Sequence, residues 1–276
     1  MKSNPLLLFI SLILCQLVLS QDIDYIETYK QFTKGDTVFA WAPKTKLYKS
    51  ANQKSKVIAE IPPNVSFIVD TIKENNNEYK LEHPAFYPVL LNGKRVYVLS
   101  EQLAEFRLSV SKSSVMFFRK ELGSDENSNP QYRMQIRLCR AGEIVSETSI
   151  HLRQHLLSVE LLDSKGLTEV DRLIFIHFHA QACGEEGGTT ILMLKNDLIN
   201  EIAQTINISD AGVFGFKTNL IFPTDENGIP EKVIYTSELH TLYDEETEWE
   251  TITTARRVHE WTGTQIFPDI ENYPEW

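Results

Sequence analysis

The chain has 276 residues and a formal net charge of −11, with 38 acidic and 27 basic side chains. This acidic balance argues against nucleic acid as a partner, because binding to its phosphate backbone draws on a surplus of Lys and Arg. Beyond the N-terminus the longest apolar segment is 173–178, which His177 interrupts and which is too short for a membrane-spanning helix. We therefore expect no transmembrane segment in the mature protein.

The N-terminus predicts a cleavable signal peptide over residues 1–20. Lys2 precedes an apolar run at 6–19, about 14 residues long and so shorter than the roughly 20 that span a bilayer, and polarity returns at Gln21. An uncleaved N-terminal anchor is the alternative. No lipid anchor is expected at Cys15, because Leu14 precedes it where Gly, Ala or Ser is usual. We expect a periplasmic or secreted protein.

Residues 35–104 are typical of a small β-barrel. Turn residues separate short apolar or β-branched runs, which lie at 37–41, 46–48, 57–61, 65–71, 79–81, 88–91 and 96–99. Asn92-Gly93 predicts a two-residue hairpin turn, since Asn and Gly tolerate positive φ.

Several segments of this region resemble a bacterial SH3-like (SH3b) domain over about 70 residues. The resemblance is carried by Val38-Phe39-Ala40, by 47–51 and 55–64, and by Gly93-Lys94-Arg95-Val96-Tyr97-Val98 with Leu103. The chain departs from the family at Leu47-Tyr48-Lys49-Ser50, where Leu-Asn-Val-Arg is usual, at Asn64, and at the closing Gly-Trp-Val. The resemblance implies contact with cell-wall peptides or glycans.

Aromatic rings beside cations point to the same kind of ligand. Trp41, Tyr48, Lys49 and Tyr97 are the expected ligand-binding residues, and five lysines cluster nearby, at Lys44, Lys46, Lys49, Lys54 and Lys56. Region 35–104 carries nine basic and seven acidic residues, so any electrostatic attraction is local. A solvated loop is the alternative interpretation of this cluster.

Residues 105–276 predict a second, β-rich region with an acidic tail. Its β runs lie at 106–110, 115–119, 132–139, 143–150, 158–162, 173–179, 190–194, 198–206, 212–216 and 232–235. Alternation within 132–139 predicts one buried and one wet face, whereas 173–178 is apolar on both faces. We expect antiparallel sheets packed as a sandwich or a partial propeller-like domain.

An Asp-x-x-Gly-x-x-Glu pattern occurs twice in this region, at 163–169 and 225–231. The second copy weakly resembles the turns of FG-GAP-like propeller repeats. Calcium prefers oxygen ligands, which Asp225, Asn227 and Glu231 would supply, so this turn is a candidate calcium site. The alternative is an ordinary Asx turn followed by a solvated glutamate.

A second candidate metal site lies at the end of the run at 173–179. His177 and His179 share one face of a strand, and Cys183 follows, which suggests a zinc-dependent hydrolase. Packed, neutral histidine rings are the alternative. Cys139 and Cys183 are expected to pair as a disulfide in an oxidising compartment, or else to remain separate thiols.

The sequence contains no Gly-x-Ser-x-Gly, His-Glu-x-x-His or Gly-rich phosphate-binding motif. The leading hypothesis is therefore an exported, non-enzymatic protein whose SH3-like module contacts cell-envelope peptide or glycan. The metal-dependent hydrolase is one alternative. Another is a scaffold that recruits a protein through the acidic segment 244–250, and the oligomeric state is left open.

Overall fold

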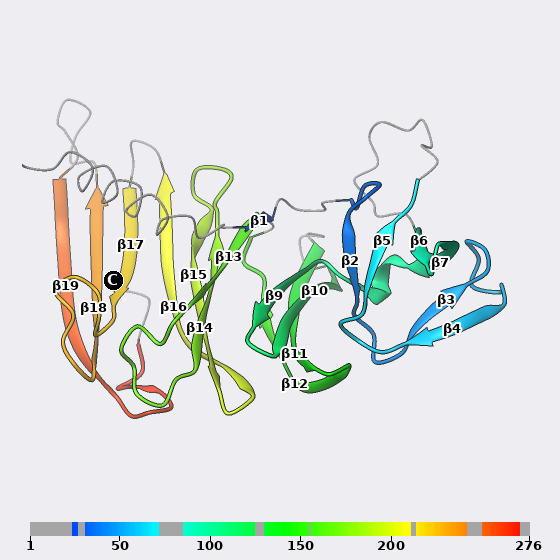
Figure 1. Cartoon of the computed structure of the whole chain (residues 1–276). Coiled ribbons are helices and arrows are strands. Elements are labelled where there is room, and N and C mark those ends of the chain that lie inside the picture. Colours follow the sequence, from blue (N-terminus) through cyan, green and yellow to red (C-terminus); the bar gives the residue numbers. More distant parts are fainter. Residues whose placement is uncertain are drawn as a thin grey trace, which may run out of the picture.

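A computed structural model describes residues 24–26, 31–71, 85–124, 130–154, 156–210, 214–241 and 250–270. These hold twenty β-strands and one 3₁₀ helix, in three antiparallel sheets, so the mainly β prediction is confirmed (Figure 1). The predicted signal peptide, the strand expected at 79–81 and residues 244–249 of the acidic segment lie outside the described residues. The described part of the chain contains no helix with the length and apolarity to cross a membrane.

The first sheet has seven strands in the order β4-β3-β7-β6-β5-β2-β8. The strands are β2 (Thr37–Ala40), β3 (Thr45–Tyr48), β4 (Val57–Ile61), β5 (Ser66–Val69), β6 (Phe86–Leu91), β7 (Lys94–Leu99) and β8 (Leu103–Ala104), with the 3₁₀ helix η1 (Ser100–Gln102) before the last. The sheet is not closed into a barrel, since β4 and β8 form its two ends.

Local sequence explains how this sheet turns and packs. The turn between β6 and β7 is the predicted hairpin, with positive φ at Asn92 and Gly93 and pairing of Leu91 with Lys94. Inward-facing side chains such as Leu47 and Tyr87 form the core of the sheet. Burial raises the pKa of Tyr87 to about 12.

The second sheet has four strands in the order β12-β11-β10-β9. They are β9 (Phe106–Val110), β10 (Ser113–Ser124), β11 (Pro130–Arg140) and β12 (Glu143–His151). The alternation predicted for 132–139 is confirmed on one face, where Met134, Ile136 and Leu138 are buried. The opposite face is not entirely wet, because Cys139 packs with Trp41 and Met116 against the first sheet.

The third sheet has nine strands in the order β1-β13-β14-β15-β16-β17-β18-β19-β20. They are β1 (Asp24–Ile26), β13 (Leu157–Leu162), β14 (Arg172–Phe178), β15 (Glu186–Lys195), β16 (Leu198–Asp210), β17 (Phe214–Ile221), β18 (Lys232–Thr241), β19 (Glu250–Trp261) and β20 (Ile266–Phe267).

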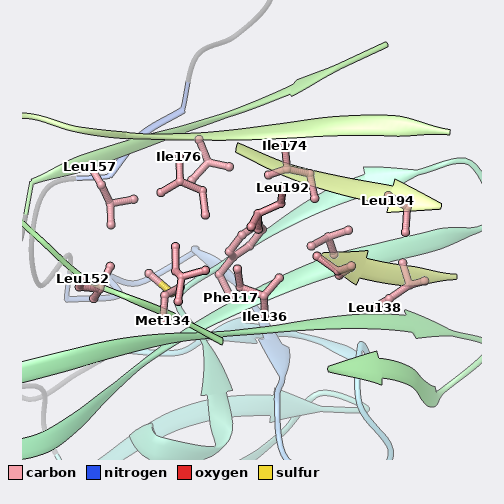
Figure 2. Close-up of a cluster of buried hydrophobic side chains, with 14 of the residues drawn as sticks. Phe117, Met134, Ile136, Leu138, Leu152, Leu157, Ile174, Ile176, Leu192 and Leu194 are labelled. Carbon is pink, nitrogen blue, oxygen red and sulfur yellow. The ribbon is translucent and has the colours of Figure 1, made fainter. Parts of the chain in front are cut away.

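The second and third sheets face each other across a shared apolar core. Phe117, Met134 and Ile136 of the second sheet meet Ile174, Leu192 and other residues of the third (Figure 2). A further cluster covers the other face of the third sheet and includes Leu173 and Phe222. As predicted for 173–178, β14 is therefore buried on both faces.

Candidate functional site

The candidate site is the hairpin formed by β3, β4 and the turn 49–56, here called the basic hairpin. It lies at the end of the molecule farthest from the third sheet (Figure 1). The five lysines of this region, Lys44, Lys46, Lys49, Lys54 and Lys56, are all exposed. They form a concentrated positive surface on an otherwise acidic protein.

Hydrogen bonds within the turn fix the backbone that carries the lysines. The Lys49 amide donates to the Lys56 carbonyl oxygen at 3.0 Å. The Ser50 amide donates to Ser55 Oγ at 3.1 Å, and the Lys54 amide donates to Asn52 Oδ1 at 2.8 Å. Short polar side chains thus satisfy the turn backbone, as is usual for Asn and Ser. The Lys side chains are left to point into solvent.

The basic hairpin also ends in an open sheet edge. Among the described residues β4 pairs with β3 alone, so its other side presents backbone amide and carbonyl groups. Ala59 and Ile61 pack on the core of the first sheet, while Val57 and Ile58 are 39% and 43% exposed. An edge strand with exposed apolar residues is a template onto which an extended peptide can add as a further strand.

The aromatic residues predicted to bind ligand are mostly interior. Trp41 is 4% exposed and stacks on Phe118, with ring centroids 5.3 Å apart. Tyr48 is 6% exposed and packs edge-on against Phe86 at 5.6 Å, while its cross-strand neighbour Tyr97 is half-buried. Stacking on a sugar needs an open ring face, which burial removes at Trp41 and Tyr48. Of the four predicted residues, Lys49 is the exposed one.

The two Asp-x-x-Gly-x-x-Glu turns lie against each other, one between β13 and β14 and the other between β17 and β18. Asp225 Oδ1 is 2.6 Å from Lys165 Nζ, which comes from the other turn. Asp225 Oδ2 accepts a 2.8 Å hydrogen bond from the Phe222 amide. The Lys165 ammonium thus already neutralises the carboxylate, while the other predicted calcium ligands, Asn227 and Glu231, are exposed at positive φ.

His177 of β14 and His179, which directly follows this strand, both form hydrogen bonds to neighbouring strands. His177 Nδ1 lies 2.9 Å from Thr189 Oγ1, and His179 Nε2 lies 2.9 Å from Ser158 Oγ. Burial, and secondarily the nearby His177, lowers the pKa of His179. Cys183 is exposed in the following turn. Within the described ranges no three His, Cys, Asp or Glu side chains are grouped to hold a metal ion.

The expected disulfide between Cys139 and Cys183 is not formed. Both cysteines are free, because Cys139 is buried in β11 between the first two sheets, whereas Cys183 lies in an exposed turn of the third sheet. Burial raises the pKa of the Cys139 thiol. The alternative of two separate thiols is the one that the structure has.

A cleft between the second and third sheets was missed by the sequence interpretation. This cleft, here called the inter-sheet cleft, has a volume of about 540 Å³. It is lined by residues of the β9–β10 turn, of β11, of the start of β14, and of the end of β15 with the turn that follows it. The residues that line the cleft come from four separate segments of the sequence. Only the polar turn at 111–113 could be recognised from local sequence, and no spacing pattern indicates that these segments lie together.

We compared the chain with protein-family models, curated proteins and solved structures, and none of the three comparisons found a match.

Proposed function

We propose that this is an exported, non-enzymatic binding protein whose first sheet is an SH3-like module that contacts cell-envelope peptide or glycan. The observation that carries the proposal is the basic hairpin, which bears four exposed lysines, Lys46, Lys49, Lys54 and Lys56, and ends in the open edge of β4. The contact is made through these lysines, since Trp41 and Tyr48 are part of the core.

Two features support an SH3-like module. β2 pairs with both β5 and β8, which brings the two ends of the segment together, as expected for an independent folding unit. The segment also has its own apolar core, built from residues of β2, β3 and β5 to β8. The FG-GAP-like resemblance of the turn at 225–231 remains a prediction. This turn and the one at 163–169 each join neighbouring strands of the same nine-stranded sheet.

The chemistry of the hairpin favours an anionic, peptide-bearing polymer. Ammonium groups attract carboxylates, and the edge of β4 offers backbone hydrogen bonds to an extended peptide. Because the lysines are exposed, their attraction is screened at distances beyond about 8 Å at physiological salt. Binding should therefore weaken as salt is raised.

Sedimentation with purified peptidoglycan tests the proposal. We expect the wild-type protein to co-sediment and the triple variant Lys49→Glu, Lys54→Glu, Lys56→Glu to remain in solution. The matched control is Lys217→Glu, Arg256→Glu, Arg257→Glu, which reverses three exposed charges on the third sheet. Failure of the wild-type protein to sediment, or equal loss in both triple variants, would contradict the proposal.

A further inference from the structure

A small pocket lies where the first and second sheets meet. Its walls come from the segment before β2, from η1 and the residues that follow it, from the second half of β10 and from the start of β11. The Glu105 amide joins the two sheets beside it by donating to the Phe117 carbonyl oxygen at 2.9 Å. The volume of this pocket, here called the aromatic pocket, is about 200 Å³. That is below the roughly 300 Å³ at which sites for drug-sized ligands begin, so the pocket suits a ligand of few atoms.

Three aromatic side chains line the aromatic pocket and keep part of their surface exposed. They are Phe32, Phe118 and Tyr132, and each is half-buried. Phe118 stacks on Trp41 with ring centroids 5.3 Å apart, and Phe32 packs against Tyr87 at 5.2 Å. These contacts with the core fix the positions of two of the rings. Because the faces of aromatic rings carry negative charge density, such a wall attracts cations.

A buried ion pair lies in the wall of the same pocket. The Arg119 side chain is 3% exposed, and its Nη2 lies 3.6 Å from Glu105 Oε2. The Arg119 amide also donates to Glu105 Oε1, at 3.2 Å. Glu105 thus offsets the charge of this guanidinium, and the pair ties β10 to the segment that follows β8. The wall is therefore held by polar contacts as well as by ring packing.

The remaining charges of the aromatic pocket are negative. Glu101 and Glu121 line it, are exposed, and form no ion pair in the described part of the chain. Glu121 is the direct cross-strand partner of Tyr132, so its carboxylate and the phenol ring share one face of the sheet. Lys120 points to the opposite face, since neighbours in a strand alternate. Three acidic side chains and one basic side chain line the pocket, which leaves a surplus of two negative charges.

We propose that the aromatic pocket binds a small quaternary ammonium ion. Such an ion has no N–H group, so it is held by ring faces and by carboxylate charge rather than by hydrogen bonds, and this pocket supplies both. The methyl groups contact Phe32, Phe118 and Tyr132, while Glu101 and Glu121 balance the positive charge. The site is separate from the basic hairpin and does not depend on its function.

Isothermal titration with choline tests the assignment. We expect one choline per protein, and about tenfold weaker binding of 3,3-dimethylbutan-1-ol, which has the same shape but no charge; tenfold corresponds to about 1.4 kcal/mol. The double variant Glu101→Gln, Glu121→Gln should weaken choline binding by a similar factor. Because both residues are exposed, this variant should keep the wild-type melting temperature. Phe32→Leu keeps an apolar side chain without the ring, and should also weaken binding.

The matched control is Glu143→Gln, Glu226→Gln. Both residues are exposed, lie away from the pocket and form no ion pair among the described residues, so the control makes the same change in net charge. It should bind choline as the wild-type protein does. The assignment is overturned if choline does not bind, if 3,3-dimethylbutan-1-ol binds equally well, or if both double variants lose the same affinity.

Vesicles of phosphatidylcholine distinguish the two sources of a quaternary ammonium group. Protein that sediments with these vesicles and is released by free choline takes the group from a lipid headgroup. Protein that binds choline but does not sediment with the vesicles takes it from a free ion. Both results keep the ammonium site. Sedimentation that choline does not reverse, and that Glu101→Gln, Glu121→Gln does not reduce, would count against it.

Discussion

The guanidinium of Arg137 lies over the indole ring of Trp41, with its central carbon 4.1 Å from the ring centroid, and Arg137 Nη1 donates a 2.8 Å hydrogen bond to the Trp41 carbonyl oxygen. Arg137 comes from β11 and Trp41 follows β2, so this contact joins the first and second sheets. Glu147 pairs with the same guanidinium. Trp41 is therefore a residue of the interface between sheets.

Replacing Trp41 should reduce stability. Trp41→Ala removes the stacking on Phe118 and leaves a cavity, so we expect a loss of about 3–5 kcal/mol in the free energy of unfolding. Trp41→Phe keeps a ring in place and should cost less. Urea unfolding measures both. Wild-type stability in Trp41→Ala, together with lost peptidoglycan binding, would instead favour a ligand-binding role.

Asp225 is expected to act through Lys165 and the turn backbone. Asp225→Ala removes the ion pair with Lys165 and leaves the half-buried Phe222 amide without its acceptor, which should cost about 1–3 kcal/mol. Asp225→Asn keeps an acceptor oxygen and should cost less. Thermal unfolding should show no shift in midpoint when millimolar calcium is added. A clear upward shift that Asp225→Asn abolishes would restore the calcium interpretation.

The two cysteines should differ sharply in reactivity. A maleimide should label Cys183 in the native protein without any reductant, because that side chain is exposed. Cys139 should react only after unfolding, since it is buried and its raised pKa keeps the thiol protonated. Peptide mapping assigns the labelled residue. Protection of both cysteines until a reductant is added would show that they pair.

His179 should make the protein less stable in mild acid. Burial holds its pKa below the ordinary 6.5, so the unfolded chain binds more protons than the folded protein between the two pKa values. The free energy of unfolding should therefore fall as the pH drops below about 6.5. His179→Gln keeps a polar group facing Ser158 and should flatten this slope. An unchanged slope in denaturant titrations from pH 7.5 to 5 would contradict the expectation.

Gly188 marks a close approach of two strands. A Cβ added there would lie 2.1 Å from the Thr205 carbonyl oxygen, and the residue has a φ of +125°. At Gly184, with a φ of +78°, nothing lies within 4 Å. Gly188→Ala should thus destabilise by more than Gly184→Ala, for which backbone strain alone costs about 1–3 kcal/mol. Equal melting temperatures for the two variants would show that β15 and β16 can move apart.

Much of the local structure followed from the sequence. Residues in a strand alternate between its faces, so the burial of Met134, Ile136 and Leu138 was predictable from their spacing. The hairpin turn at Asn92-Gly93 was predictable because these two residues accept positive φ. The lysines of the basic hairpin were also visible as a cluster, since they are neighbours in the sequence.

The tertiary structure decided which residues can meet a ligand. Trp41 and Tyr48 were predicted to be accessible, but whether a ring is covered depends on partners such as Phe118 and Phe86, far away in the sequence. The inter-sheet cleft likewise depends on four separate segments.

Strand periodicity thus determined which residues share a face of a strand, because that relationship is set within a few residues of the backbone. It did not determine which sheet covers that face. Cys139 and Cys183 are separated because β11 packs against the first sheet while the turn of Cys183 extends into solvent. Contacts between sheets, and between strands of one sheet, are made by side chains that are distant in the sequence. These contacts decided that the rings of Trp41 and Tyr48 are buried and that a cleft remains between the second and third sheets.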